Sequence, residues 1–248
     1  MASRHSFLLN RWRQSPLWVR VLPFALFVAL TSCQGLLGEG SKYWIYAFKT
    51  FIGAILIYLV SPWVREMRWR WSWSALIIGV AVFVLWVGLD GLYPPIEVVA
   101  KNIVNPVARP LGLEQWCAAT AEAAAPWNPH HHFAAPMAWF FVLARLVGSS
   151  LVVPPLEEVF YRSFLYRYVV KPEFTTVPLN YFRWGPLLLT SAIFGLAHRE
   201  WLAGVLCGLL YQGLVLRSNR LGDAITAHAI TNFLLGLWVM SKSAWHFW

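Results

Sequence analysis

The sequence predicts an all-α, polytopic integral membrane protein with about eight transmembrane helices around an intramembrane polar cavity. Composition is the first reason. Of the 248 residues, 58% are hydrophobic and 12% are charged, against roughly 25% charged in soluble domains. The second reason is a series of apolar segments, most of them close to the ~20 residues that a helix needs to cross a bilayer. The third is the sixteen tryptophans, because indole side chains gather at lipid–water interfaces.

The first half of the chain holds three apolar segments whose flanking charges set their orientation. These segments are residues 21–38, 43–61 and 73–92. Arginines precede the first segment and follow the second, at Arg65, Arg68 and Arg70. Because basic loops stay in the cytoplasm, we expect a cytoplasmic N-terminus and a non-cytoplasmic loop after the third segment.

A proline-rich loop at residues 93–135 divides the chain. We assign residues 1–135 to an N-terminal region with a basic start, three transmembrane helices and this loop. Residues 136–248 form the predicted catalytic core. Within the loop, residues 96–105 fit a short interfacial helix.

The core begins with an apolar helix at residues 136–153, which Pro154 and Pro155 are expected to end because proline lacks a backbone N–H. A new helix then runs to about residue 170. Glu157 and Glu158 would lie in its first turn, near the positive end of the helix dipole. Three more helices are expected at residues 185–198, 201–217 and 222–240. Helices this short, or interrupted by charge, are typical of a cavity lining.

The net charge of +9 would favour nucleic-acid binding in a soluble protein. Here the basic residues cluster at the ends of apolar segments, where they orient helices and meet anionic lipid head groups. We therefore expect the lipid bilayer as a partner and no nucleic acid.

Two glutamates and an arginine interrupt the apolar pattern of the fifth predicted helix. Glu158 and Arg162 are one turn apart, in the order that favours an ion pair. Glu157 lies about 100° around the helix and has no such neighbour. A carboxylate in a low-dielectric pocket is able to act as a general base near neutral pH, which makes Glu157 the candidate base. A purely structural Glu158–Arg162 pair is the alternative.

Histidine and asparagine supply further polar groups. His228 and Asn232 share one helix face, and His198 ends another helix, one turn after Phe194. Two histidines and a carboxylate from three helices could meet in the bundle core, as a metal site or as a general-base constellation. Each pair alone could also be a hydrogen bond that joins two helices.

These residues carry a family resemblance. The chain resembles the CPBP family, also called the Abi family, at three motifs. In order, they are Glu157-Glu158-x-x-x-Arg162, Phe194-x-x-x-His198 and His228-x-x-x-Asn232. That family contains the type II CAAX prenyl endopeptidases and bacteriocin-processing and self-immunity proteins. The resemblance covers about residues 140–240 and implies an all-helical membrane core with intramembrane endopeptidase activity. Ser163 departs from the family, in which a smaller residue often follows the motif arginine.

The resemblance also implies roles for the site residues. Glu157 and His198 would activate a water, while His228 and Asn232 would stabilise the oxyanion of the tetrahedral intermediate. Arg162 would hold Glu158 and position the glutamate helix, and the supporting residues are Glu158, Arg162 and Phe194.

A metal is the open alternative, because the family is often labelled metalloprotease. Glu157, His198 and His228 could supply the three protein ligands of a catalytic zinc. The sequence has no HExxH motif, and an asparagine one turn after the third ligand suits an oxyanion role better. We therefore favour a mechanism without a cofactor.

The sequence thus predicts a multi-pass protein of a bacterial inner membrane. We expect its peptide or protein substrate to arrive from the membrane or from the cytoplasmic side. One alternative is a catalytically silent scaffold or immunity protein that binds a membrane or peptide partner. A transporter or proton relay would use the same carboxylates, but the repeat symmetry typical of transporters is not evident.

Overall fold

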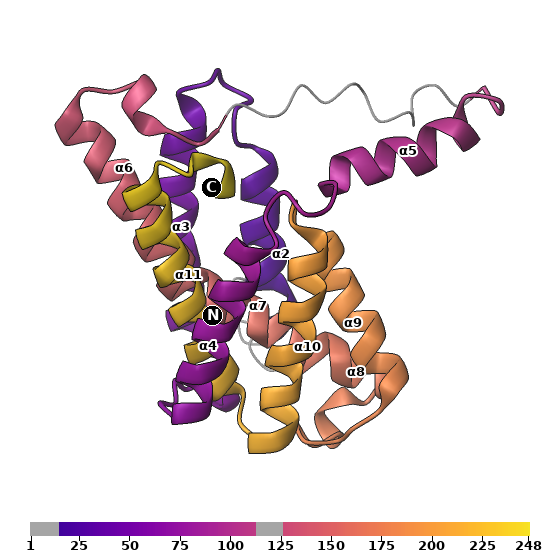
Figure 1. Cartoon of the computed structure of the whole chain (residues 1–248). Coiled ribbons are helices and arrows are strands. Elements are labelled where there is room, and N and C mark those ends of the chain that lie inside the picture. The colour runs from indigo at the N-terminus through magenta and orange to yellow at the C-terminus, as the bar shows by residue number, and fades with distance from the viewer. Residues whose placement is uncertain (1–14, 113–125) are drawn as a thin grey trace, which may run out of the picture.

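The computed structural model describes residues 15–112 and 126–248, and every regular element in these two ranges is a helix (Figure 1). Residues 113–125 of the predicted loop lie outside the described residues, as do residues 1–14. The all-α fold class predicted from composition is confirmed.

The described helices include several with the length and composition of membrane spans. Four are long and apolar enough to cross a bilayer: α3 (Ser41–Val60), the continuous helix Ala135–Val170, α10 (Trp201–Ser218) and α11 (Leu221–Lys242). Shorter apolar helices are α2 (Trp18–Ser32), α4 (Trp73–Gly88) and α9 (Trp184–Leu196). The protein is therefore a polytopic membrane protein.

The continuous helix Ala135–Val170 changes its hydrogen-bond register along its length. In order, its segments are α6 (Ala135–Val147), a π-helical stretch (Gly148–Val152), α7 (Val153–Glu158), a second π-helical stretch (Val159–Leu165) and α8 (Tyr166–Val170). π-Helical turns are rare and occur mostly at functional sites. Both stretches flank the segment that carries the two glutamates.

One prediction for this helix is wrong. An α-helical segment does begin at Val153, directly before the two prolines, but the chain before it is π-helical and does not leave the helix. Glu157 and Glu158 lie at the end of α7, and its first turn holds no acid. The wider turn accommodates the prolines, so no free helix N-terminus forms and the dipole argument does not apply.

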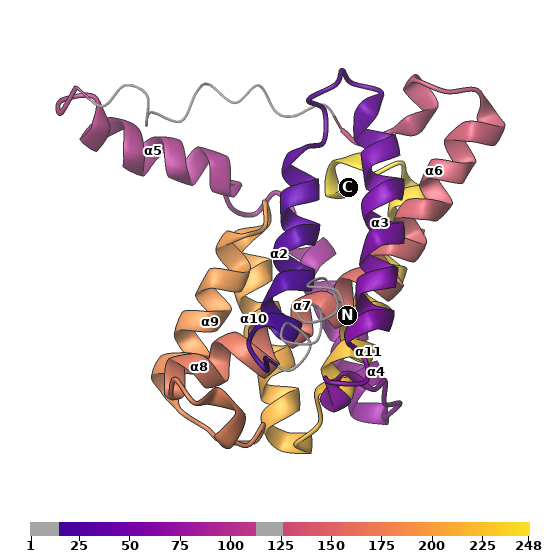
Figure 2. The same cartoon turned by 180° about the vertical axis from the view of Figure 1, so that it is seen from behind.

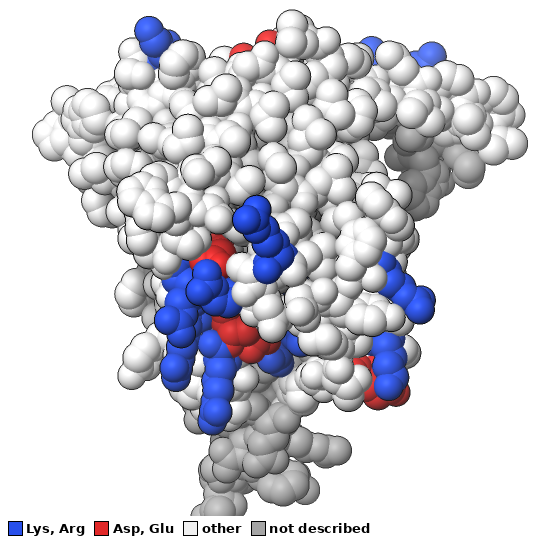
Figure 3. All heavy atoms as spheres, turned by 60° about the horizontal axis from the view of Figure 1, so that its bottom comes forward, with Lys and Arg blue, Asp and Glu red and all other residues white. Residues whose placement is uncertain are grey.

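Helix ends meet at two opposite faces of the bundle. One face holds the starts of α4, α9 and α11 and the ends of α3, α8 and α10 (lower side of Figures 1 and 2). Basic side chains gather on it (Figure 3). Its shallow pocket is lined in part by Arg65, Arg68, Arg70 and Arg220. We call it the basic face.

The opposite face carries α5 (Ile96–Ala108), the helix predicted at residues 96–105, which projects away from the bundle (Figures 1 and 2). Val98, Ile103 and Val107 expose apolar side chains along it. An amphipathic helix in this position suits the lipid–water interface.

Glycines allow the helices that carry the site to approach closely. A Cβ on Gly204 of α10 would lie 2.8 Å from the Cα of Gly195 of α9. A Cβ on Gly79 of α4 would lie 2.7 Å from the carbonyl oxygen of Ala227 in α11. Small residues at helix contacts are the usual means of tight packing in membranes, and here they hold α9 and α11 close to their neighbours.

Candidate active site

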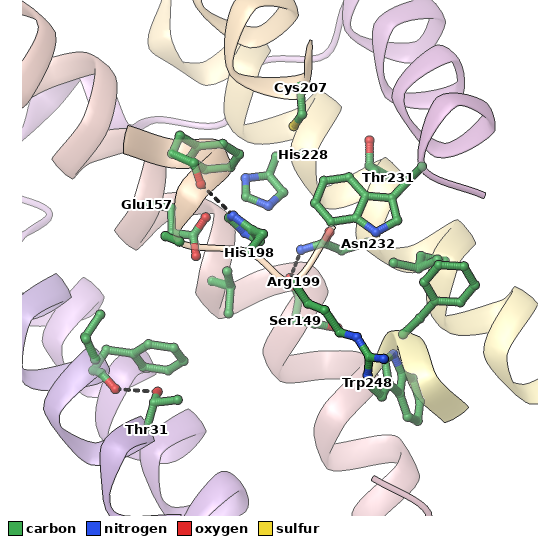
Figure 4. Close-up of a pocket in the computed structure, with 18 of the residues that line it drawn as sticks. Thr31, Ser149, Glu157, His198, Arg199, Cys207, His228, Thr231, Asn232 and Trp248 are labelled. Carbon is green, nitrogen blue, oxygen red and sulfur yellow. Dashed lines mark hydrogen bonds between the residues drawn. The ribbon is translucent and has the colours of Figure 1, made fainter. Parts of the chain in front are cut away.

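A polar chamber of about 510 Å³ lies inside the bundle (Figure 4). Side chains of α2, α3 and α4 form its wall together with side chains of the long helix, α9, α10 and α11. Glu157, His198, His228 and Asn232 all line it. The structure thus brings together four residues from three motifs that are far apart in sequence.

Glu158 does not share the position of Glu157. Its side chain is fully buried, and its Oε2 lies 3.1 Å from Nε of Arg162. Its Oε1 lies 2.9 Å from Nδ1 of His228. The predicted ion pair between Glu158 and Arg162 is therefore present. The bond from Glu158 to His228 was not predicted, because it joins residues 70 positions apart.

Glu157 points into the chamber from the same helix (Figure 4). Its Oε2 is buried and accepts no hydrogen bond from any described residue. Buried carboxylate oxygens normally have partners. Of the two adjacent glutamates, Glu157 is thus the one available to a ligand or a water, as the helical spacing predicts.

His198 lies just beyond the end of α9, which stops at Leu196 and not at residue 198 as predicted, and it is held by that helix. Its Nδ1 lies 2.7 Å from the carbonyl oxygen of Phe194. Because a carbonyl only accepts, the hydrogen of the neutral ring belongs on Nδ1, which leaves Nε2 as an acceptor in the chamber. The ring also contacts Trp86 edge-on, at 5.6 Å between centroids. The orientation of His198 is therefore set before any substrate binds.

Phe194 supports a second site residue. The Arg162 guanidinium lies 4.4 Å from the centre of the Phe194 ring. Phe194 therefore contacts both the arginine that holds Glu158 and the histidine one turn later, in agreement with its predicted supporting position.

Asn232 is anchored by the π-helical stretch. Its Nδ2 donates to the carbonyl oxygen of Ser149 at 2.8 Å. The Val153 N–H bonds to the Gly148 carbonyl, five residues earlier. In that register the Ser149 carbonyl would face the nitrogen of Pro154, which has no hydrogen to donate. The proline thus leaves an acceptor free for Asn232.

Tyr211 belongs to the site although the sequence reasoning did not select it. Its fully buried ring packs against His228 at 5.2 Å between centroids. Its hydroxyl donates to Thr231 Oγ1 at 2.7 Å, and Thr231 in turn donates to the Gly79 carbonyl at 2.8 Å. A tyrosine in an apolar helix carries no local signal of such a network.

The residues proposed as zinc ligands do not form a metal cluster. In the two described ranges, no group of three or more His, Cys, Asp and Glu side chains is placed to hold a metal ion. Nδ1 of His228 is occupied by Glu158, and Nδ1 of His198 by a backbone carbonyl. Both contacts leave Nε2 of the ring free, and a metal-bound histidine commonly has its other ring nitrogen hydrogen-bonded in this way.

Ser163 joins a second cluster, at the basic face. Its hydroxyl donates to Glu66 Oε1 at 2.6 Å, and Arg20 Nη2 donates to the same oxygen at 2.7 Å. Arg167 lies 3.4 Å from that oxygen. Burial acts to raise the pKa of Glu66, but Arg20 and Ser163 outweigh it and hold the pKa below its usual value. We call Arg20, Glu66, Ser163 and Arg167 the Glu66 cluster.

Fold and chamber together define a helical, polytopic membrane protein with a buried carboxylate, two histidines and an amide around one cavity. Residues 137–234 match the family model described as type II CAAX prenyl endopeptidase Rce1-like. This domain is consistent with the CPBP and CAAX protease family, and it supports a CAAX-type intramembrane protease at the level of the family. The match covers less than half of the chain but includes all the predicted site residues. Comparison with curated proteins and with solved structures found no match.

Proposed function

We propose that the protein is an intramembrane endopeptidase in which Glu157 and His198 activate a water without a metal. The observation that carries the proposal is the contrast between the two glutamates. Glu158 is occupied by Arg162 and His228, whereas Glu157 faces the chamber beside a histidine whose Nε2 is an acceptor. A positioned base and an open cavity are the two requirements of general-base hydrolysis.

The reaction would proceed by addition and elimination. Glu157, with His198, takes a proton from the water, and the hydroxide oxygen attacks the carbonyl carbon of the scissile bond. The resulting oxyanion accepts a hydrogen bond from the second amide hydrogen of Asn232. A second bond comes from Nε2–H of His228, which in this proposal is the imidazolium that also donates Nδ1–H to Glu158. The proton held at the base then passes to the leaving nitrogen, and the C–N bond breaks.

The supporting contacts suit these roles. The Ser149 carbonyl accepts a hydrogen bond from Asn232 Nδ2 and so fixes the orientation of the amide. Glu158 fixes the His228 ring through Nδ1 and so directs Nε2 into the chamber. Pre-oriented donors stabilise a developing charge more than mobile ones do.

The position of the chamber favours a substrate route different from the one expected from sequence. The chamber reaches Arg199 and Trp248, which lie at the ends of elements on the face opposite the basic face. If the basic face is cytoplasmic, the chamber opens toward the non-cytoplasmic side. We therefore include that side as an entry route.

The test is cleavage of a peptide library by the purified full-length protein in nanodiscs. Wild type, Glu157→Gln and His198→Ala are compared with Glu173→Gln, a matched change at an exposed glutamate outside the chamber. We expect cleavage by wild type and Glu173→Gln only. If wild type cleaves nothing while its cellular effect survives Glu157→Gln, the protein is a scaffold rather than a peptidase.

A further inference from the structure

A buried lysine and a partly buried arginine in the chamber have no part in the proposed chemistry. Lys49 of α3 is 4% exposed and lines the chamber. Its Nζ donates to Thr31 Oγ1 at 2.8 Å and lies 4.5 Å from the centre of the Phe27 ring. A lysine this deep in an apolar helix is rare unless it is paired or functional.

Arg145 lines the chamber next to Lys49. Its guanidinium lies 4.7 Å from the centre of the Tyr46 ring, and Lys49 Nζ lies at the same distance from that ring. The guanidinium also lies 4.5 Å from the centre of the Trp127 ring. The two cations therefore share one aromatic neighbour, the Tyr46 ring.

Neither cation forms a salt bridge in the part of the chain that the structure describes, although Lys49 feels the charge of Glu157 across the chamber. The contrast with other buried cations is clear: Arg20 and Arg167 contact Glu66, and Arg162 contacts Glu158. Among the chamber-lining side chains, Glu157 is the one acid, against three cations with Arg199 at the mouth. A buried cation without a counter-ion is costly, so the chamber is electrostatically suited to an anion.

We propose that Lys49 and Arg145 bind a carboxylate of the peptide substrate. The inference rests on the proposed function, because a carboxylate bound here lies in the same chamber as Glu157 and His198 and would fix the peptide relative to the base. The carboxylate is either the C-terminal group of the peptide or an Asp or Glu side chain near the scissile bond. Arg145 offers paired donors for such a group, and Lys49 a point charge.

Binding is measured on full-length Glu157→Gln in phosphatidylcholine nanodiscs, so that no cleavage intervenes. The probes are fluorescent apolar peptides made with a C-terminal carboxylate or amide, and with Asp or Asn within the sequence. We expect the carboxylate forms to bind roughly tenfold to a hundredfold more tightly, the range of a charged hydrogen bond. Comparing the two peptides that differ at the C-terminus, and the two that differ as Asp and Asn, identifies which carboxylate the site binds.

Variants at the two cations connect the preference to the site. Lys49→Met and Arg145→Gln should abolish the preference and leave the affinity of the uncharged forms unchanged, whereas Lys49→Arg and Arg145→Lys should keep part of it. Lys42→Met is the matched control, because Lys42 lies on the same helix, stacks on Tyr43 and does not line the chamber. Thermal unfolding checks that each variant is folded.

Three results would overturn the inference: equal affinity for charged and uncharged peptides, equal loss of both on Lys49→Met, or no peptide binding. Competition by phosphatidylglycerol without any peptide preference would assign the cations to a lipid instead. Carboxylate-dependent binding without cleavage by wild type would support the carboxylate subsite and refute the peptidase activity. Cleavage without a preference for the carboxylate forms would support the peptidase activity and refute the subsite.

Discussion

The long helix Ala135–Val170 contributes side chains to two clusters of charge, which differ in how completely the charges are paired. In the Glu66 cluster, one carboxylate oxygen is approached by Arg20, Ser163 and Arg167. In the chamber, Glu157 Oε2 has no hydrogen-bond partner among the described residues, and neither Lys49 nor Arg145 forms a salt bridge with a described residue. Saturated charges stabilise a structure, whereas unsaturated ones are available to a substrate. The comparison predicts which substitutions affect stability and which affect activity.

The largest effect is expected for Glu157→Gln. Loss of the base should reduce kcat by roughly 10²–10⁴-fold, while the unfolding temperature stays close to that of wild type because no hydrogen bond to Oε2 is lost. Kinetics on a library-derived peptide and thermal unfolding in detergent measure the two quantities. A large loss of stability with an unchanged kcat would contradict the proposal that Glu157 serves activity and not stability.

The opposite pattern is expected for Glu66→Gln. Arg20 and Arg167 would lose their carboxylate, and breaking a buried ion pair costs about 3–5 kcal/mol. We expect the lower end, since 19% of the Glu66 side chain is exposed. Chemical denaturation should show this loss while kcat of the folded fraction is retained. Glu173→Gln, at an exposed pair, should change neither quantity.

Asn232→Ala tests the oxyanion role. Removing one such donor lowers kcat by roughly 10²–10³-fold and should leave KM nearly unchanged. Stability should fall by only about 1 kcal/mol for the lost bond to Ser149. Asn102→Ala on α5 is the control, because its side chain lies outside the chamber. A raised KM with normal kcat would assign Asn232 to ground-state binding instead.

A smaller effect should appear in the pH dependence of stability. The folded-state pKa of Glu66 is lowered, so its contribution is present above the unfolded pKa of about 4.3 and is lost as pH falls through the folded value. The difference in unfolding temperature between wild type and Glu66→Gln should therefore shrink below about pH 4. A constant difference from pH 7 to pH 3 would contradict this account.

Removal of metal should have the smallest effect. Treatment with EDTA or 1,10-phenanthroline is expected to leave cleavage unchanged under the proposed mechanism. Elemental analysis of the purified protein provides a second measurement. Stoichiometric zinc that is lost in His228→Ala would overturn the metal-free proposal.

Local spacing predicted the part of the site that depends on a single helix. The pairing of Glu158 with Arg162 follows from one helical turn, and the availability of Glu157 follows from the same geometry. The all-helical membrane fold followed from composition and segment length. These features were predictable because they are set by neighbours in sequence.

Contacts between helices were not predictable in this way. The bond from His228 to Glu158 and the anchoring of Asn232 depend on tertiary packing, and the second also depends on a π-helical turn. Lys49 and Arg145 belong to different helices, so nothing local indicated that they share Tyr46. The signal for Lys49 was its charge within an apolar span, and the sequence reasoning did not use it.

The π-helical stretch before Pro154 has a consequence for how this helix tolerates changes in length. A π turn holds about one residue more than an α turn, so it is equivalent to a single-residue insertion that the helix has absorbed. Deleting one residue within Gly148–Val152 would remove this insertion and keep the glutamates in phase with α6, but it would place Pro154 in an α-helical turn, where its ring meets a carbonyl of the turn before it. Such a deletion would also change the carbonyl that accepts from Asn232. The orientation of the Asn232 amide would then change while the two glutamates keep their positions on the helix. Related chains that differ by one residue here would then share the same glutamates but differ in how they stabilise an oxyanion.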